Sequence, residues 1–284
     1  MITPRARTSL TKRNAGEDRV RTWLEIGEAL ERQLEPLGRV AIDRLQLVAG
    51  HEVLDIGCGI GGTSSAMAQI VGPRGKVVGI DALSAAVDVM QSRTTPQTTF
   101  SVLHGDAETY PFASGSFDAA FSRFGIMFFK NSVNAFSNIR RALRPGGRIA
   151  FVCWCGLEEN ELDKLPIRAA APHLPTAILS RVAQAEHFKF ANPSYLRDVL
   201  INAGYADIDI CPHDKKVRSG SLLSMLNVCS RVGSLGALLR EYPTFYHQSV
   251  EALKRALVRI DGPGGPALTG AIWAVTATAP HPID

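Results

Sequence analysis

The residues best suited to bind a ligand form a glycine-rich run, Asp55-Ile56-Gly57-Cys58-Gly59-Ile60-Gly61. An apolar run of strand type precedes it, and a helical pattern follows it. Gly57 and Gly59 allow a tight turn whose backbone approaches a ligand with no Cβ in between. A helix that begins after such a loop offers free N–H groups and a partial positive charge. Gly57, Gly59 and Gly62 also satisfy the dinucleotide fingerprint, but this spacing alone leaves the ligand open.

Asp55 narrows the choice of ligand. It lies two residues before Gly57, at the end of the expected strand. A carboxylate beside the loop repels a pyrophosphate and attracts an ammonium group. The loop is therefore predicted to prefer a ligand that is zwitterionic or cationic at that end.

The elements that must position this loop are short apolar runs that alternate with helical patterns. The runs lie at 52–57, 76–81, 99–103, 117–122 and 148–153, and two more strands are expected near 208–210 and 271–276. Strands separated by single helices indicate crossover connections. The expected fold is therefore α/β, a doubly wound, Rossmann-like, mostly parallel seven-stranded sheet with helices on both faces.

The whole chain, 1–284, is predicted to form a single domain. In the segment 20–48, Pro36 and Gly38 are expected to divide the helical pattern into two helices. The predicted segments are a basic arm at 1–19, an N-terminal helical lid at 20–48, a cofactor-binding core at 49–154, an insertion at 155–192 and a helical insertion before the last strand at 219–265.

The run from Asp55 to Gly61 resembles the first motif of class I S-adenosylmethionine-dependent methyltransferases, and the flanking regions resemble members that act on small molecules. Further matches follow in the order of that family. They are Gly79-Ile80-Asp81, His104-Gly105-Asp106-Ala107, Pro111-Phe112 with Asp118, and Leu143 to Arg148.

The resemblance implies S-adenosylmethionine as the cofactor and assigns roles to residues of the loop. Asp55 and Gly57 would hold the amino and carboxylate groups of its methionine part, with Cys58 and Gly59 in the same loop. Asp81 would accept hydrogen bonds from the ribose hydroxyls, a task that suits a carboxylate.

The resemblance also implies residues for the adenine end and for the place where cofactor and acceptor meet. Asp106 would accept from the adenine amino group and Ala107 would offer its backbone N–H. The remaining expected cofactor residues are Ala82, Leu83 and Ser122, and the expected substrate-binding residues are Arg123, Phe124, Trp154 and Trp23.

Transfer of a methyl group from a sulfonium mainly requires that the nucleophile be held in line and water be excluded. A base is needed only where the acceptor loses a proton. The family pattern transfers no fixed catalytic residue, so the base stays unassigned; His173, in the proline-rich insertion, is the weak candidate.

Three functions remain open at this point. The first is a methyltransferase that acts on a small molecule, a metabolite or natural product, with the acceptor atom undetermined. The second is a regulatory or non-catalytic protein with the same fold and cofactor site. The third is an NAD-dependent oxidoreductase, which only the glycine spacing supports and Asp55 opposes.

Possible acceptor contacts lie outside the motifs. A phosphate or carboxylate on the acceptor would find partners among Arg123, Arg168 and Arg181. Aromatic residues that could line the pocket are Trp23, Trp154, Phe128, Phe129, Tyr242 and Phe245.

Composition and short motifs argue against other classes of protein. The net charge is +4 and is scattered, which disfavours a nucleic-acid partner. Asn192-Pro193-Ser194-Tyr195 looks like the signature of amino-methylating nucleic-acid enzymes but reads better as a helix cap. The five cysteines suit reduced thiols and no metal site. No stretch reaches the ~18 apolar residues of a membrane span, so a cytoplasmic protein is expected, either monomer or homodimer.

Overall fold

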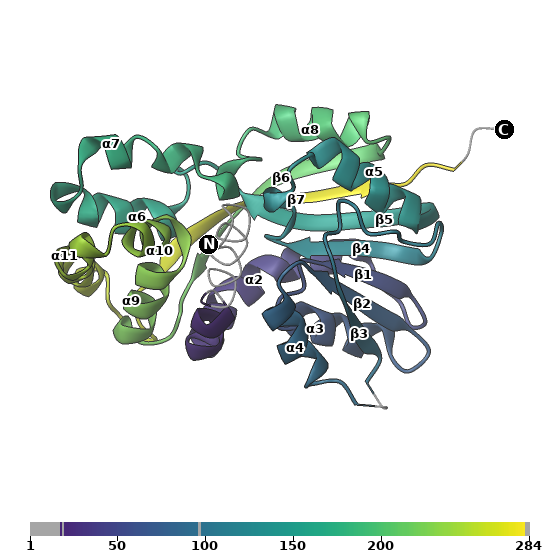
Figure 1. Ribbon diagram of the computed structural model, residues 1–284, viewed down its shortest axis with the longest axis horizontal. Coiled ribbons are helices and arrows are strands. Elements are labelled where there is room, and N and C mark those ends of the chain that lie inside the picture. The colour runs from purple at the N-terminus through teal and green to yellow at the C-terminus, as the bar shows by residue number, and fades with distance from the viewer. Residues whose placement is uncertain (1–17, 19, 96–97, 282–284) are drawn as a thin grey trace, which may run out of the picture.

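The computed structural model describes residue 18, residues 20–95 and residues 98–281. The predicted basic arm, apart from Asp18, lies outside the described residues. Figure 1 shows a twisted sheet with helices on its faces and, beside it, a layer made of helices alone.

The sheet has seven strands in the order β3-β2-β1-β4-β5-β7-β6. Strands β1 to β5 are parallel, whereas β7 runs antiparallel to both β5 and β6. The predicted mostly parallel, seven-stranded α/β fold is confirmed. The strands are β1 (Glu52–Ile56), β2 (Lys76–Asp81), β3 (Phe100–His104), β4 (Phe117–Arg123), β5 (Leu143–Trp154), β6 (Ala206–Val217) and β7 (Leu268–Thr278).

Two apolar cores, one on each face of the sheet, hold the helices in place. Val53 and Leu54 follow one another in β1 and point into different cores, as alternation along a strand requires. One core joins the sheet to α2 (Gly27–Leu45) and α3 (Gly62–Val71). The other joins it to α5 (Ser132–Ala142) and α8 (Pro193–Asn202), and α4 (Ser84–Gln91) packs against β2 and β3.

The N-terminal helical segment differs from its prediction. The predicted break at Pro36 and Gly38 is wrong: residues 20–25 are helical, the chain bends at Ile26, and α2 continues through Pro36. A proline inside a helix removes one main-chain hydrogen bond. Burial of Leu37 and Leu45 against the sheet compensates for this loss.

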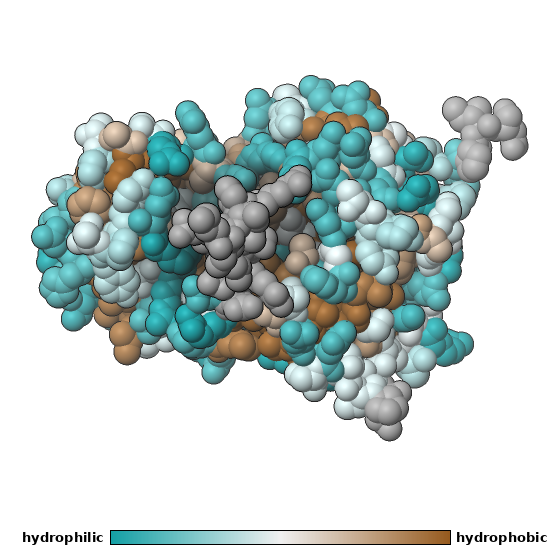
Figure 2. All heavy atoms as spheres, in the orientation of Figure 1, coloured by the Kyte–Doolittle hydropathy of each residue, from teal (hydrophilic) through white to brown (hydrophobic). Residues whose placement is uncertain are grey.

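The predicted insertions, which are far apart in the chain, form most of the helical layer. Its main helices pack against one another: α6 (Glu161–Ala170), α9 (Leu222–Arg231), α10 (Gly233–Glu241) and α11 (Tyr246–Val258). The short α7 (Thr176–Leu179) lies in the same layer in Figure 1. On the face drawn in Figure 2, apolar side chains gather in the lower middle of the view and extend toward the sheet side.

Among the described residues, no single helix is long and apolar enough to cross a membrane. The bent pair α9 and α10 reaches that length and composition when its two helices are taken together.

Candidate cofactor site at the carboxyl edge of the sheet

The glycine loop connects β1 to α3 at the point where the strand order reverses between β1 and β4, which is where doubly wound sheets bind ligands. Gly57, Gly59 and Gly61 have φ values of +68°, +55° and +89°, a region that favours glycine. A Cβ on Gly57 would stand 2.9 Å from the Cα of Gly125, which follows β4. The loop therefore needs glycine both for its turn and for its approach to β4.

Asp55 is fully buried beneath this loop. Its Oδ2 accepts hydrogen bonds from the hydroxyls of Thr63 (2.7 Å) and Ser64 (2.6 Å) in the first turn of α3. Its Oδ1 is buried and has no hydrogen-bond partner among the described residues. Burial raises the pKa of the Asp55 carboxyl from 3.8 to about 6. A buried acceptor with this environment is suited to a cationic donor such as an ammonium group.

Asp81 ends β2 and fastens the loop from the other side. Its Oδ2 accepts from the Gly59 N–H and its Oδ1 from the Leu83 N–H, both at 2.9 Å. Cys58, between the glycines, is buried, and burial raises the pKa of its thiol well above the usual range. Cys58 therefore fills space as a neutral thiol, while the Asp81 carboxylate is held in one orientation at the strand end.

The predicted adenine-end residues lie beyond the neighbouring strand ends. The Gly105 N–H donates to the carbonyl of Asp81, which places the turn after β3 beside the end of β2. Asp106 is exposed, and its Oδ1 accepts from the Glu108 N–H at 3.0 Å, as a turn-capping carboxylate does. Ala107 is buried. Of the two residues that follow Asp81, Ala82 is exposed and Leu83 half-buried.

Ser122, at the end of β4, is fully buried and engaged with main chain. Its hydroxyl donates to the carbonyl of Ile56 at 2.8 Å and accepts from the Gly125 N–H at 3.2 Å. These bonds tie the ends of β1 and β4 together beneath the loop. The hydroxyl thus has a structural task that the sequence did not indicate.

An aromatic stack borders the site where β4 and β5 end. Phe124 and Trp154 stack with ring centroids 3.9 Å apart and planes 12° from parallel. Phe124 has a φ of +61°, a strained conformation for a residue with a side chain, which the surrounding structure must hold. Strain of this kind is often found at functional sites.

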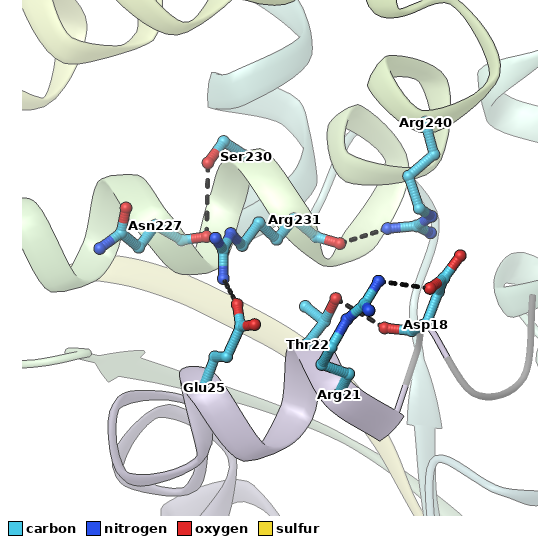
Figure 3. Close-up of polar contacts among 8 residues, drawn as sticks. All are labelled: Asp18, Arg21, Thr22, Glu25, Asn227, Ser230, Arg231 and Arg240. Carbon is cyan, nitrogen blue, oxygen red and sulfur yellow. Dashed lines mark hydrogen bonds and ion pairs between the residues drawn. The ribbon is translucent and has the colours of Figure 1, made fainter.

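The N-terminal helical turn lies over the glycine loop. Cζ3 of Trp23 is 3.9 Å from the point where a Cβ of Gly59 would stand. Figure 3 shows how the turn is tethered to the helical layer: the Glu25 carboxylate pairs with the guanidinium of Arg231 in α9 at 2.5 Å. Within that layer, Arg240 of α10 donates to the carbonyl of Arg231. The structure therefore brings Trp23 to the loop.

Three other predicted residues, His173, Arg168 and Arg181, lie in the helical layer. His173 lies in the short helix η2 (Ala171–His173), which packs chiefly against α6 and α11. Arg181 is exposed, and its Nη1 lies 3.7 Å from Oε1 of Glu241 in an ion pair. Arg168, in α6, is exposed. Phe128 is exposed too, but it lies in the short helix η1 (Ile126–Phe128) that follows β4 at the carboxyl edge.

A different histidine has a structured polar environment in the helical layer. Nε2 of His187 lies 3.1 Å from the Ser234 hydroxyl and 3.8 Å from the Asp163 carboxylate. Burial lowers the pKa of His187, so the neutral imidazole is favoured. Asp163 also accepts from the Ser234 N–H at 2.6 Å, which anchors the start of α10.

Sequence reasoning missed Gly125, Thr63, Ser64 and Glu31. Arg123 is paired with Glu31 of α2 by two hydrogen bonds of 2.7 Å each. Gly125, Thr63 and Ser64 lie within or next to recognisable motifs, so their roles could have been predicted from the sequence. Glu31 lies in a helix with many carboxylates and carried no signal.

Comparison with known proteins bears on this site. Residues 54–151 match the family model of a methyltransferase domain. The chain is 31% identical over 146 residues to demethylmenaquinone methyltransferase of Staphylococcus aureus, covering 51% of this chain and 53% of that protein. It is 36% identical over 128 residues to an uncharacterised 37.1 kDa protein of a Streptomyces fradiae transposon, covering 45% of this chain and 35% of that protein. The chain thus spans about half or less of the length of these relatives.

Solved structures share the fold. Phosphoethanolamine N-methyltransferase 2 of Haemonchus contortus, solved with phosphomonomethylethanolamine and S-adenosylhomocysteine, aligns with a TM-score of 0.55 at 21% identity; the match covers 87% of this chain and 53% of that one. The YcgJ protein of Bacillus subtilis aligns with a TM-score of 0.53 at 17% identity, covering 85% of this chain and 97% of that one.

Proposed function

We propose that this chain, whose residues 54–151 match the family model of a methyltransferase domain, is a class I S-adenosylmethionine-dependent methyltransferase that transfers a methyl group from this cofactor to a small-molecule acceptor by direct in-line displacement. The observation that carries the proposal is the buried Oδ1 of Asp55 beneath the glycine loop, which lacks a hydrogen-bond partner among the described residues. An unpaired buried carboxylate oxygen is costly, and the ammonium group of the cofactor would satisfy it.

When bound, S-adenosylmethionine supplies an electrophilic methyl group on a positively charged sulfur. The residues of the chain then have to bind and orient. Asp55 would hold the ammonium group, and Asp81, already oriented by the Gly59 and Leu83 N–H groups, would accept from the ribose hydroxyls. The stack of Phe124 and Trp154 would keep water from the acceptor side.

The small-molecule acceptor is supported by the relatives, whose names refer to demethylmenaquinone and phosphoethanolamine. Arg123, considered above as a partner for an acidic acceptor, is already paired with Glu31. An NAD-dependent oxidoreductase is disfavoured because a buried carboxylate under the loop would repel a pyrophosphate.

A thermal-shift experiment with S-adenosylhomocysteine, run beside NAD, tests the proposal. A ligand at about 100 times its dissociation constant stabilises by ~2.7 kcal/mol, which corresponds to roughly 2–4 °C for a domain approaching this size. We expect a shift with S-adenosylhomocysteine alone. A shift with NAD alone would refute the assignment, and binding without methylation of any acceptor in a small-molecule panel would favour the regulatory alternative.

Replacement of Asp81 by alanine is expected to weaken S-adenosylhomocysteine binding by on the order of 1–3 kcal/mol, because charge-assisted hydrogen bonds to the ribose are lost. Isothermal titration calorimetry would measure the change. Asp88→Ala is the matched control, since Asp88 is exposed on α4, the helix that follows β2. Equal affinity of wild type and Asp81→Ala would remove Asp81 from the ribose role.

A further inference from the structure

An ion pair beside the glycine loop joins two segments far apart in the chain. Nη1 and Nη2 of Arg123, at the end of β4, donate to Oε1 and Oε2 of Glu31 in α2, each at 2.7 Å. The Arg123 side chain is only 14% exposed, whereas the Glu31 side chain is 44% exposed. A ligand that enters from solvent can therefore reach the carboxylate, while the guanidinium behind it is held in place.

The fold makes room for the buried partner of this pair. A Cβ on Gly38 would stand 2.5 Å from Cδ of Arg123, so a larger residue at position 38 would force the Arg123 side chain to shift from its present place beneath α2. The guanidinium is thereby held in the layer between α2 and the end of β4. A side chain packed in this way keeps its orientation when a ligand arrives.

The ion pair lies at the start of α3. Oε2 of Glu31 is 3.2 Å from the point where a Cβ of Gly62, the first residue of α3, would stand. The residue before it, Gly61, has no side chain to cap the helix, and the first N–H groups of a helix have no partners within it. The positive charge of Arg123 also reaches Asp55, where it lowers the carboxyl pKa against the larger effect of burial.

The region thus contains two acidic groups and one basic group around a helix N-terminus. A zwitterionic amino-acid end needs donors for its carboxylate and acceptors for its ammonium group. The start of α3 supplies the donors; Glu31, held in place by Arg123, and the buried Oδ1 of Asp55 supply the acceptors. We propose that Glu31 and Arg123 form part of the binding site for the amino-acid end of the cofactor. This inference rests on the proposed function and adds Glu31, from outside the methyltransferase-domain match, to the site.

The test compares two ligands that differ only in this end. S-adenosylhomocysteine carries the amino-acid group, whereas 5′-methylthioadenosine has the same adenosine and a thioether without it. Glu31→Gln keeps the size of the side chain and removes its charge. We expect Glu31→Gln to weaken S-adenosylhomocysteine binding about tenfold or more and to leave 5′-methylthioadenosine binding within about twofold.

Two further variants sharpen the comparison. Arg123→Lys keeps the charge but loses the two-pronged geometry, and should also weaken only S-adenosylhomocysteine binding. Glu35→Gln is the matched control, because Glu35 is an exposed carboxylate of the same helix. The thermal midpoint of each variant without ligand shows whether it is folded.

The outcomes separate this inference from the proposed function. If Glu31→Gln weakens both ligands equally, or neither, the ion pair only fastens α2 to the sheet and the inference fails. If wild type binds both ligands equally well, the amino-acid end is not recognised; the inference then fails while the cofactor assignment stands. If wild type binds neither ligand, the proposed function fails, and this inference with it.

Discussion

Replacement of Asp55 by asparagine is expected to make the ligand-free protein more stable and, at the same time, worse at binding S-adenosylhomocysteine. The asparagine Oδ1 can still accept from the hydroxyls of Thr63 and Ser64, so the contacts to α3 are retained. What disappears is a buried charge. The pKa difference between 3.8 and about 6 corresponds to a cost of up to ~3 kcal/mol for ionising Asp55 in the folded protein.

The pH dependence of this stability difference follows from the raised pKa of Asp55 in the folded protein. Because the pKa of Asp55 is higher in the folded than in the unfolded protein, the unfolded chain releases this proton first as pH rises. The free energy of unfolding of wild type should therefore fall between pH 4 and pH 6, and the loss should be complete above about pH 6. Asp55→Asn lacks this loss, so it should be more stable by about 1–3 kcal/mol at pH 7.5 and gain nothing below about pH 4.

Ligand binding should change in the opposite direction. Loss of the carboxylate removes a charge-assisted hydrogen bond to the ammonium group, which should weaken S-adenosylhomocysteine binding by about 2–3 kcal/mol at pH 7.5. In wild type the affinity should also fall as pH drops below about 6 and Asp55 becomes protonated. The Asp55→Asn variant should show no such pH dependence.

Urea unfolding at pH 7.5 and pH 4, together with calorimetric titration over the same range, measures both effects. Asp88→Asn, on an exposed position of α4, controls for the change in net charge. A destabilised Asp55→Asn variant would show that the carboxylate is needed for the fold. Unchanged affinity would show that the buried Oδ1 does not bind the ammonium group.

The parts of this site that were predictable from the sequence are local. Gly57, Gly59 and the carboxylates Asp55 and Asp81 lie at strand ends, and each strand was visible as an apolar run. The order of the strands then brings these ends together without further information. The role of a loop glycine or a strand-end carboxylate is decided by the few residues around it.

The parts that could not be predicted depend on contacts between distant segments. Arg123 and Glu31 are 92 residues apart, and nothing local to either marks them as partners. Pro36 was read as a helix break because propensity is local, whereas packing of α2 on the sheet overrides it. The length of strand β6 was underestimated, since a strand was expected only near 208–210. Its exposed positions carry Asp and Lys, which obscure the strand pattern of an antiparallel edge strand with one solvated face.

The second large expected effect is the loss of stability when Gly57 of the glycine loop is replaced by alanine. Alanine at Gly57 would have to adopt a φ of +68° and place its Cβ 2.9 Å from the Cα of Gly125. The left-handed conformation alone costs roughly 1–2 kcal/mol for a residue with a side chain. The Cβ would meet a main-chain atom of Gly125, so the contact cannot be relieved by rotation of a side chain. We expect Gly57→Ala to destabilise the protein by about 3–4 kcal/mol in total and to reduce S-adenosylhomocysteine binding.

Two other glycines separate the conformational cost of alanine at a positive φ from the cost of the contact with Gly125. Gly115 has a φ of +62° and open space around its Cβ position, so Gly115→Ala measures the conformational cost alone. At Gly59 the Cβ would meet only Cζ3 of Trp23, at 3.9 Å, so Gly59→Ala should cost about as much as Gly115→Ala. Urea unfolding of the three variants gives the comparison. If Gly57→Ala costs no more than the other two, β1 and β4 can move apart, and the site is not held by the close approach of their ends. The extra cost at Gly57, if found, measures how firmly the sheet holds the loop against β4, where cofactor and acceptor are proposed to meet.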